Sequence, residues 1–198
     1  MTLLAAALLA VATLAPADAA DAPECASLDT CIAWFDANAQ RLAGDGERLC
    51  ELAQAQLPRF GQSARRALFE RLDAAEPARR YAACALAGIG SPMLRAVFDY
   101  MVEHEAREER WSAAQDVIRR MGAAAAGMAA TWQHIATDVQ ESPAPRIAAL
   151  RAIEALGAQA ATTRTAIDPL ARDEDPEIRE AARRAIGAID GVAAATPS

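Results

Sequence analysis

Apolar residues recur along this chain at the spacing of a helix. In the stretch DEDPEIREAARRAIGAID, residues 173–190, an acidic turn with a proline precedes a stripe of apolar positions: Ile178, Ala181, Ala182, Ala185, Ile186 and Ile189. Intervals of three and four residues place such positions on one helix face. Pro176 suits the first turn of that helix, where its missing N–H removes no hydrogen bond. The stretch therefore predicts an amphipathic helix that buries alanine and isoleucine.

The same pattern occurs three more times upstream. Residues 75–90, 107–122 and 141–157 each carry apolar side chains at helical spacing and end at a glycine. The equivalent apolar positions are 32, 35 and 33 residues apart, at Leu86, Ile118, Ile153 and Ile186. A period of this length indicates stacked two-helix units, each too small to bury its own apolar face.

A second helical pattern follows each of the first three copies. Residues 91–104 and 127–140 keep apolar positions at helical spacing, and residues 160–173 do so as far as Pro169, where we expect the helix to break. The predicted organisation is an N-terminal segment with a capping helix over 20–43, a repeat domain over 44–190 and a disordered tail over 191–198.

The residues that carry the repeat resemble a known family. Asp-x-Asp-Pro-Glu-Ile-Arg at 173–179, and the Arg-x-x-Ala-x-x-Ala-(Leu/Ile)-x-x-(Leu/Ile) series ending at 89, 156 and 189, are similar to the HEAT-like repeat family in its short, phycobilisome-lyase-type form. The resemblance is close over 75–190 and looser over 44–74. It implies an all-α fold, a right-handed α-solenoid of about four to five helix pairs. It implies little about chemistry, because the family hosts many functions.

The resemblance also assigns a structural role to polar residues of the turns. A polar residue precedes an arginine by six positions in three repeats: Asp73 and Arg79, Gln140 and Arg146, Asp173 and Arg179. In HEAT-like arrays such positions form a ladder, so we expect these arginines to hold carboxylates or carbonyls of the adjacent unit. Trp111 stands where the remaining arginine belongs, so we expect the ladder to break there. Anion binding by the arginines is the alternative.

The beginning of the sequence predicts export. Leu3 to Leu14 is an apolar run of about a dozen residues, too short to span a bilayer. Pro16 and the small-x-small pattern Ala17-Asp18-Ala19 follow. These features indicate a signal peptide over 1–19, with a buried N-terminal helix as the alternative. We therefore expect a periplasmic or secreted protein that is not stably inserted in a membrane.

Export changes the interpretation of the four cysteines, Cys25, Cys31, Cys50 and Cys84. An even number in an oxidising compartment predicts two disulfides, and the sequence alone leaves three connectivities open. We expect Cys25–Cys31 to close a short loop at a helix start, and Cys50–Cys84 to join successive repeats, because they lie about one period apart. With no C-x-x-C and no histidine nearby in sequence, a metal site or a redox pair is disfavoured.

The charge balance and the absence of certain motifs limit which partners and activities we expect. The chain has 20 basic residues, all arginine, against 27 acidic ones, for a net charge of −7. This balance argues against nucleic acid, whose phosphates need a basic face. The sequence also contains no nucleophile elbow and no phosphate-binding glycine loop. We therefore expect a non-catalytic protein without a cofactor.

One group of residues could instead bind a metal ion. His104 and Glu108 are four residues apart and could share a helix face, with His134 of the next repeat as a third ligand. The competing interpretation is a solvated, acidic helix end. Di-iron hydroxylases of the HEAT-like type use several His-Glu pairs, whereas this chain has only His104 and Glu105, which disfavours that activity.

The remaining candidate site is a surface. Second helices of such arrays usually line the concave face, so we expect their non-core positions to contact a protein or peptide: Arg95, Asp99, Tyr100, His104, Gln133, His134 and Asp138. Tyr100 and Trp132 are the expected anchors, although the helical spacing of Trp132 with Met128 and Ile135 also fits a core position. The predicted function is a protein-binding or scaffold module. The alternatives are the metal-binding protein or enzyme above, and an immunity-type inhibitor of a toxin.

Overall fold

The computed structural model describes residues 25–104 and 107–191. Within these ranges every regular element is an α-helix or a 3-10 helix, which confirms the all-α prediction there. The predicted signal peptide and nearly all of the predicted tail lie outside the described residues. No single helix in these ranges is long and apolar enough to cross a membrane, and one helix pair (78–89 with 91–103), bent by 113°, meets those criteria only when combined.

Five long helices, here called the spine helices, alternate with shorter elements. The spine helices are α2 (Gly46–Gln56), α4 (Ala78–Ile89), α6 (Glu108–Met121), α9 (Pro143–Leu156) and α11 (Pro176–Ile189). Helix α1 (Leu28–Leu42) precedes them. The flanking elements are η1 (Pro58–Ala64) with α3 (Arg65–Leu72), η2 (Ser91–Met93) with α5 (Leu94–Glu103), α7 (Ala123–Ala126) with α8 (Ala129–Thr137), and η3 (Gly157–Thr163) with α10 (Arg164–Ile167) and η4 (Asp168–Arg172).

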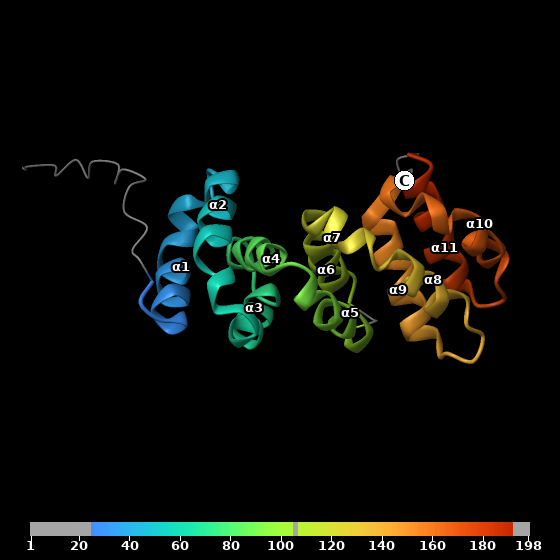
Figure 1. Ribbon diagram of the computed structural model, residues 1–198, viewed down its shortest axis with the longest axis horizontal. Helices are drawn as coiled ribbons and strands as arrows, with labels where there is room; N and C mark the ends of the chain where they lie inside the picture. Colours follow the sequence, from blue (N-terminus) through green and yellow to red (C-terminus); the bar gives the residue numbers. More distant parts are fainter. Residues whose placement is uncertain (1–24, 105–106, 192–198) are drawn as a thin grey trace, which may run out of the picture.

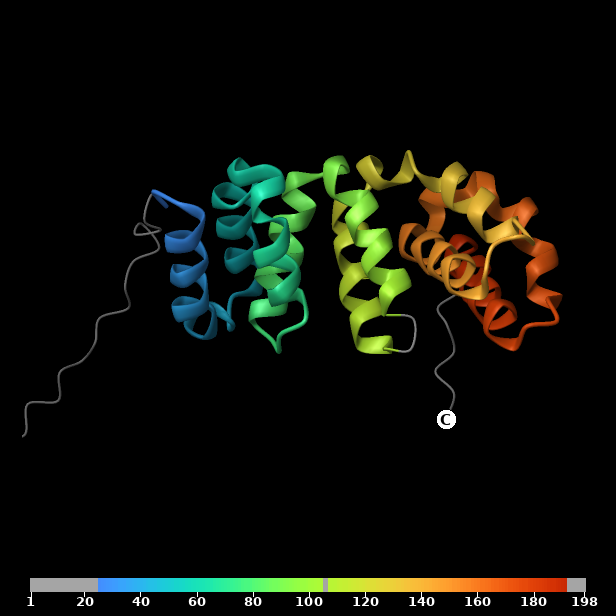
Figure 2. The same ribbon diagram turned by 90° about the horizontal axis from the view of Figure 1, so that it is seen from below.

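The helices follow one another along the long axis of the molecule, from α1 at one end to α10 and α11 at the other (Figure 1). Each spine helix packs on the next in chain order, so that α2 contacts α4, α4 contacts α6, α6 contacts α9 and α9 contacts α11. Each of α3, α5 and α8 packs on the spine helix that follows it. The view turned by 90° shows the same succession (Figure 2).

Local signals set the helix ends. The side chain of Ser27 accepts a hydrogen bond from the N–H of Thr30 and forms a capping box at the start of α1. Helices α4, α6 and α9 end at Gly90, Gly122 and Gly157, whose φ angles of 78°, 52° and 54° suit glycine. Helix α10 ends at Ile167 and the chain continues as the 3-10 helix η4, which is the break expected at Pro169.

The core follows the predicted repeat. Leu86, Ile118 and Ile153 are fully buried, and Ile186 is partly buried on the last spine helix. Each of α4, α6, α9 and α11 also buries several alanines beside larger apolar side chains. The equivalent positions of the sequence pattern therefore lie in one shared core.

Two disulfides stabilise the N-terminal half. Cys25 is bonded to Cys31, and Cys50 is bonded to Cys84, which is the pairing predicted from the sequence. The second bond links α2 to α4 across 34 residues. Both bonds are compatible with an oxidising location.

Candidate functional site

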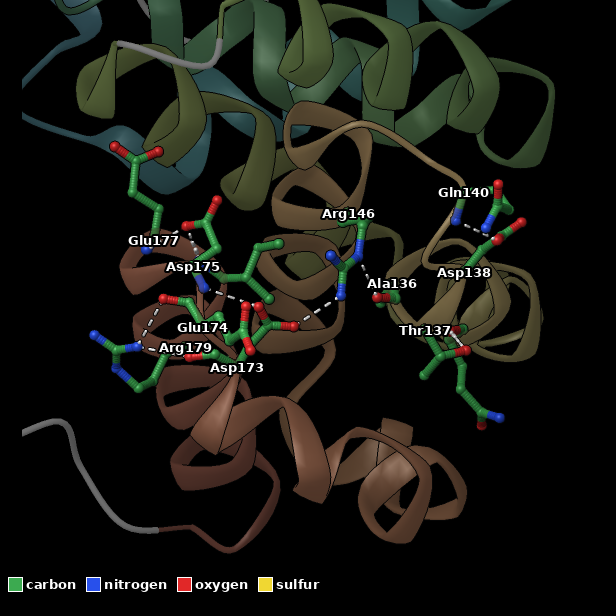
Figure 3. Close-up of polar contacts among 12 residues, drawn as sticks. Ala136, Thr137, Asp138, Gln140, Arg146, Asp173, Glu174, Asp175, Glu177 and Arg179 are labelled. Atoms are coloured by element: carbon green, nitrogen blue, oxygen red, sulfur yellow. Dashed lines mark hydrogen bonds and ion pairs between the residues drawn. The ribbon is translucent and has the colours of Figure 1, made fainter.

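Arg146 links neighbouring helix pairs (Figure 3). Its guanidinium is buried, with Nε donating to the carbonyl of Ala136 at 3.1 Å and Nη2 donating to Oδ2 of Asp173 at 3.0 Å. The other oxygen of Asp173 accepts the N–H of Asp175 at 3.0 Å, and Asp175 caps α11. Arg146 therefore connects α8, α9 and the turn before α11, as the ladder interpretation expects for this arginine.

Arg79 and Arg179 depart from that expectation. Nε of Arg79 donates to the carbonyl of Ala74 at 3.1 Å, and Nη1 of Arg179 donates to the carbonyls of Asp173 and Glu174 at 2.6 and 3.3 Å. Both arginines thus close the turn before their own helix instead of reaching an adjacent unit, because a side chain in the first helical turn can fold back on that turn. Gln140 contributes its backbone N–H, which donates to Oδ1 of Asp138 at 2.9 Å.

Asp73 has partners other than the expected Arg79. It accepts a hydrogen bond from the hydroxyl of Tyr100 and pairs with Nε of Arg110 at 3.1 Å. Burial and the bond to Asp73 raise the pKa of Tyr100, so its phenol stays protonated. Asp73, which follows α3, is thereby joined to α5 and to α6.

Trp111 takes over part of the role of the missing arginine. Its indole N–H donates to the carbonyl of Met101 at 2.8 Å, ten residues back, as Nε of Arg146 does to the carbonyl of Ala136. An indole has no second N–H, so Trp111 makes the contact to the carbonyl and lacks the contact to a carboxylate that Arg146 makes. The guanidinium of Arg151 lies 4.9 Å above the indole ring and pairs with Glu108 and Glu154.

The structure does not bring the three candidate metal ligands together. Glu108 lies between two arginines, with Oε2 at 3.1 Å from Nη2 of Arg151 and Oε1 at 3.4 Å from Nη1 of Arg184. Nδ1 of His104 is 2.8 Å from the carbonyl of Tyr100, and His134 is exposed on α8. Across residues 25–104 and 107–191, no three His, Cys, Asp or Glu side chains are grouped to hold a metal.

A groove of about 530 Å³ lies between η1 and α3 on one side and α5 on the other. It includes three of the predicted partner-binding residues, Asp99, Tyr100 and His104. The lining residues are Gln62, Ser63, Arg65, Arg66, Phe69, Glu70, Asp73, Ala96, Asp99, Tyr100, Glu103 and His104. We call this feature the α3–α5 groove.

Three aromatic rings lie along the α3–α5 groove. The ring centroids of Phe69 and Tyr100 are 5.2 Å apart, and those of Tyr100 and His104 are 4.5 Å apart. Side-chain contacts join its two walls near the start and the end of both helices. Nε2 of Gln62 donates to the carbonyl of Pro92 at 2.9 Å, and Asp73 holds Tyr100 at the opposite end. These contacts join the two walls of the groove at both ends.

Charged side chains surround the rings. The lining includes four carboxylates and two guanidinium groups, and three arginines beside the lining, Arg71, Arg95 and Arg110, pair with Glu70, Asp99 and Asp73. Arg66 pairs with Glu70 at 3.0 Å, and Arg95, beside the groove, pairs with Asp99 at 3.2 Å. The side chains of Arg66 and Arg95 are 91% and 89% exposed. Both ion pairs therefore lie on the surface and contribute little to the free energy of folding.

Three of the predicted partner-binding residues, Trp132, Gln133 and His134, lie outside the groove. Trp132 is 1% exposed and belongs to the core, as the packing alternative proposed. Gln133 and His134 lie on α8 and do not line the groove. Tyr100 lines the groove, but it is only 6% exposed and is therefore not a protruding anchor.

Sequence reasoning did not identify the wall formed by η1 and α3. Phe69 is partly buried there, between the exposed residues Arg65, Arg66 and Glu70. The sequence signal that could have identified this wall is Phe69, an aromatic residue among charged positions on a short helix. It does not indicate which helix lies opposite, because α3 and α5 meet only after the helices have packed.

A scan against protein-family models matches no family, and searches of curated proteins and of solved structures find no match. Arguments about function therefore rest on the residues and contacts of this chain. Among these, the α3–α5 groove combines a hollow with charged side chains and aromatic rings.

Proposed function

We propose that this chain is an exported α-solenoid of the HEAT-like type, with about four to five helix pairs, that acts as a protein-binding module. The repeat period, the glycine-ended spine helices and the successive packing of each spine helix on the next support the solenoid. The signal-peptide pattern and the two disulfides support a periplasmic or secreted location.

The α3–α5 groove is the observation that carries the binding role. Its two walls are joined at both ends by Gln62 and Asp73, so a partner meets a surface that is already in place. Preorganisation of this kind lowers the conformational entropy lost on binding. Because Tyr100 is a protonated donor already bonded to Asp73, it is suited to a structural role and not to proton transfer.

A capture experiment tests this function. The chain without the predicted signal peptide, residues 20–198, is immobilised and exposed to an envelope extract of the source cell. Ser63→Trp places a bulky ring at an exposed lining position, and Thr162→Trp makes the same change at an exposed position of η3. We expect one saturable protein partner that binds the wild type and Thr162→Trp but not Ser63→Trp.

The outcome depends on both variants being folded, which thermal unfolding followed by circular dichroism establishes. A partner that binds Ser63→Trp as well as it binds the wild type would place the binding surface elsewhere. Capture of no saturable partner by the folded wild-type chain would contradict the binding role itself.

A further inference from the structure

We propose that the α3–α5 groove binds an extended segment of a partner protein through an arginine side chain of that segment. This inference rests on the binding function proposed above and specifies its chemistry. It follows from the juxtaposition of aromatic rings and incompletely neutralised carboxylates in one preformed groove.

The carboxylates of the groove remain available to an incoming cation. Glu103 is exposed and forms no ion pair with any described residue, and the partner of Asp99 is the highly exposed Arg95. Glu70 pairs with the highly exposed Arg66 and also, at 3.2 Å, with the less exposed Arg71. Exposed pairs of this kind are weak, so a guanidinium from a partner can compete for the carboxylates. The overall charge of −7 also favours the approach of a basic segment.

The rings favour a planar cation. A guanidinium can lie against an aromatic face and still donate in its own plane to carboxylates, which an ammonium group does less well. Phe69 and His104 are partly exposed on the groove, and Asp99 and Glu103 lie on the same helix as Tyr100. An arginine that stacks on these rings can therefore also reach carboxylates of α5.

The chain already contains such an arrangement within its own fold. The guanidinium of Arg151 stacks 4.9 Å from the Trp111 ring and pairs with Glu108 at 3.1 Å and Glu154 at 3.2 Å. There the arginine and both carboxylates belong to the same chain. In the α3–α5 groove the rings and carboxylates are present, and the partner would supply the arginine.

The dimensions suit a short peptide. Helix α5 has 10 residues and is thus about 15 Å long. An extended chain advances about 3.3 Å per residue, so about four or five residues would span the groove. This length indicates a loop or a terminal segment of a protein as the occupant.

Fluorescence anisotropy with peptide pools tests the chemistry. Three fluorescein-labelled hexapeptide pools are randomised at every position except one central residue, which is arginine, citrulline or glutamate. Citrulline keeps the shape of arginine without its charge. We expect saturable binding of the arginine pool, at least tenfold tighter than that of the citrulline pool and weaker at higher salt.

Paired variants locate the binding. The double variant Asp99→Asn with Glu103→Gln removes two groove charges, and Glu141→Gln with Glu174→Gln removes the same charge at exposed positions outside the groove. We expect the groove variant to bind the arginine pool at least tenfold more weakly, and the control to bind it within twofold of the wild type. Thermal unfolding verifies that both variants are folded.

Several results would overturn the inference. These are no saturable binding of the arginine pool, equal binding of the citrulline pool, tighter binding of the glutamate pool, or equal losses in the two double variants. If an envelope partner is lost with Ser63→Trp but retained by the folded Asp99→Asn and Glu103→Gln variant, the binding function stands and the arginine inference fails.

Discussion

Nη2 of Arg146 lies 3.0 Å from Oδ2 of Asp173, so a buried guanidinium of α9 holds the turn that leads into α11. The same carboxylate accepts the N–H of Asp175, whose side chain caps α11. One ion pair therefore orders both the turn that precedes α11 and the first residues of that helix. This relationship makes the stability of α11 depend on a residue 27 positions away.

Arg146→Met removes this link while retaining much of the side-chain volume. We expect the free energy of unfolding to fall by about 3 kcal/mol, because Asp173 and the carbonyl of Ala136 lose a buried donor. Urea unfolding followed by circular dichroism measures the change. Arg183→Met, at an exposed position of α11, should stay within about 0.5 kcal/mol of the wild type. Similar losses in the two variants would contradict the structural role of Arg146.

The two disulfides should differ in their contribution to stability. Cys50–Cys84 closes a loop of 34 residues and Cys25–Cys31 one of 6. The loop-entropy relation then gives about 4 kcal/mol for the longer loop and about 2 kcal/mol for the shorter one. We expect urea unfolding of the paired alanine variants to reproduce this order. A smaller loss for the variant that lacks Cys50 and Cys84 would show that loop entropy does not dominate.

Asp36 should make stability depend on pH. It accepts hydrogen bonds from the hydroxyl of Tyr81 at 2.5 Å and from Nη2 of Arg71 at 2.9 Å. Burial acts to raise the pKa of Asp36, but these bonds and the charge of Arg71 outweigh it and lower the pKa below its ordinary value. A lowered folded-state pKa means stability that is present at neutral pH and lost as pH falls below the unfolded-state value.

Asp36→Asn tests this coupling. We expect a loss of about 1 kcal/mol at pH 7, since Asp36 is partly exposed, and a smaller difference from the wild type below about pH 4. Urea unfolding at pH 7 and at pH 3 supplies the comparison. Glu141→Gln, at an exposed position, is the control and should show little difference at either pH. A difference for Asp36→Asn that is equal at both pH values would exclude the linkage.

Trp111→Phe separates the indole hydrogen bond from aromatic packing. The variant keeps a ring beneath Arg151 but leaves the buried carbonyl of Met101 without its donor. We expect a loss of about 1 to 3 kcal/mol in urea unfolding. Trp34→Phe, on the partly buried face of α1, removes similar volume and should cost less. Equal losses would show that ring size, and not the hydrogen bond, is what matters.

The sequence by itself determined the local features of this protein. The period of Leu86, Ile118 and Ile153 predicted buried helix faces, and Pro169 predicted the end of α10. The pairing of Cys50 with Cys84 followed from the same period, because residues one repeat apart occupy equivalent positions on adjacent helices. The predictions of buried helix faces and of the break at Pro169 succeeded because helical periodicity and helix breaks depend on residues within a few positions of one another.

Only the tertiary structure decided which polar side chains meet. Asp73 precedes Arg79 by six residues but contacts Tyr100 and Arg110, and Trp111 occupies an arginine position yet binds the equivalent carbonyl. The α3–α5 groove likewise depends on how far apart two flanking helices lie once the spine helices have packed. Such contacts are set by the distances and angles between helices, which arise from the packing of the whole core and not from any short stretch of sequence.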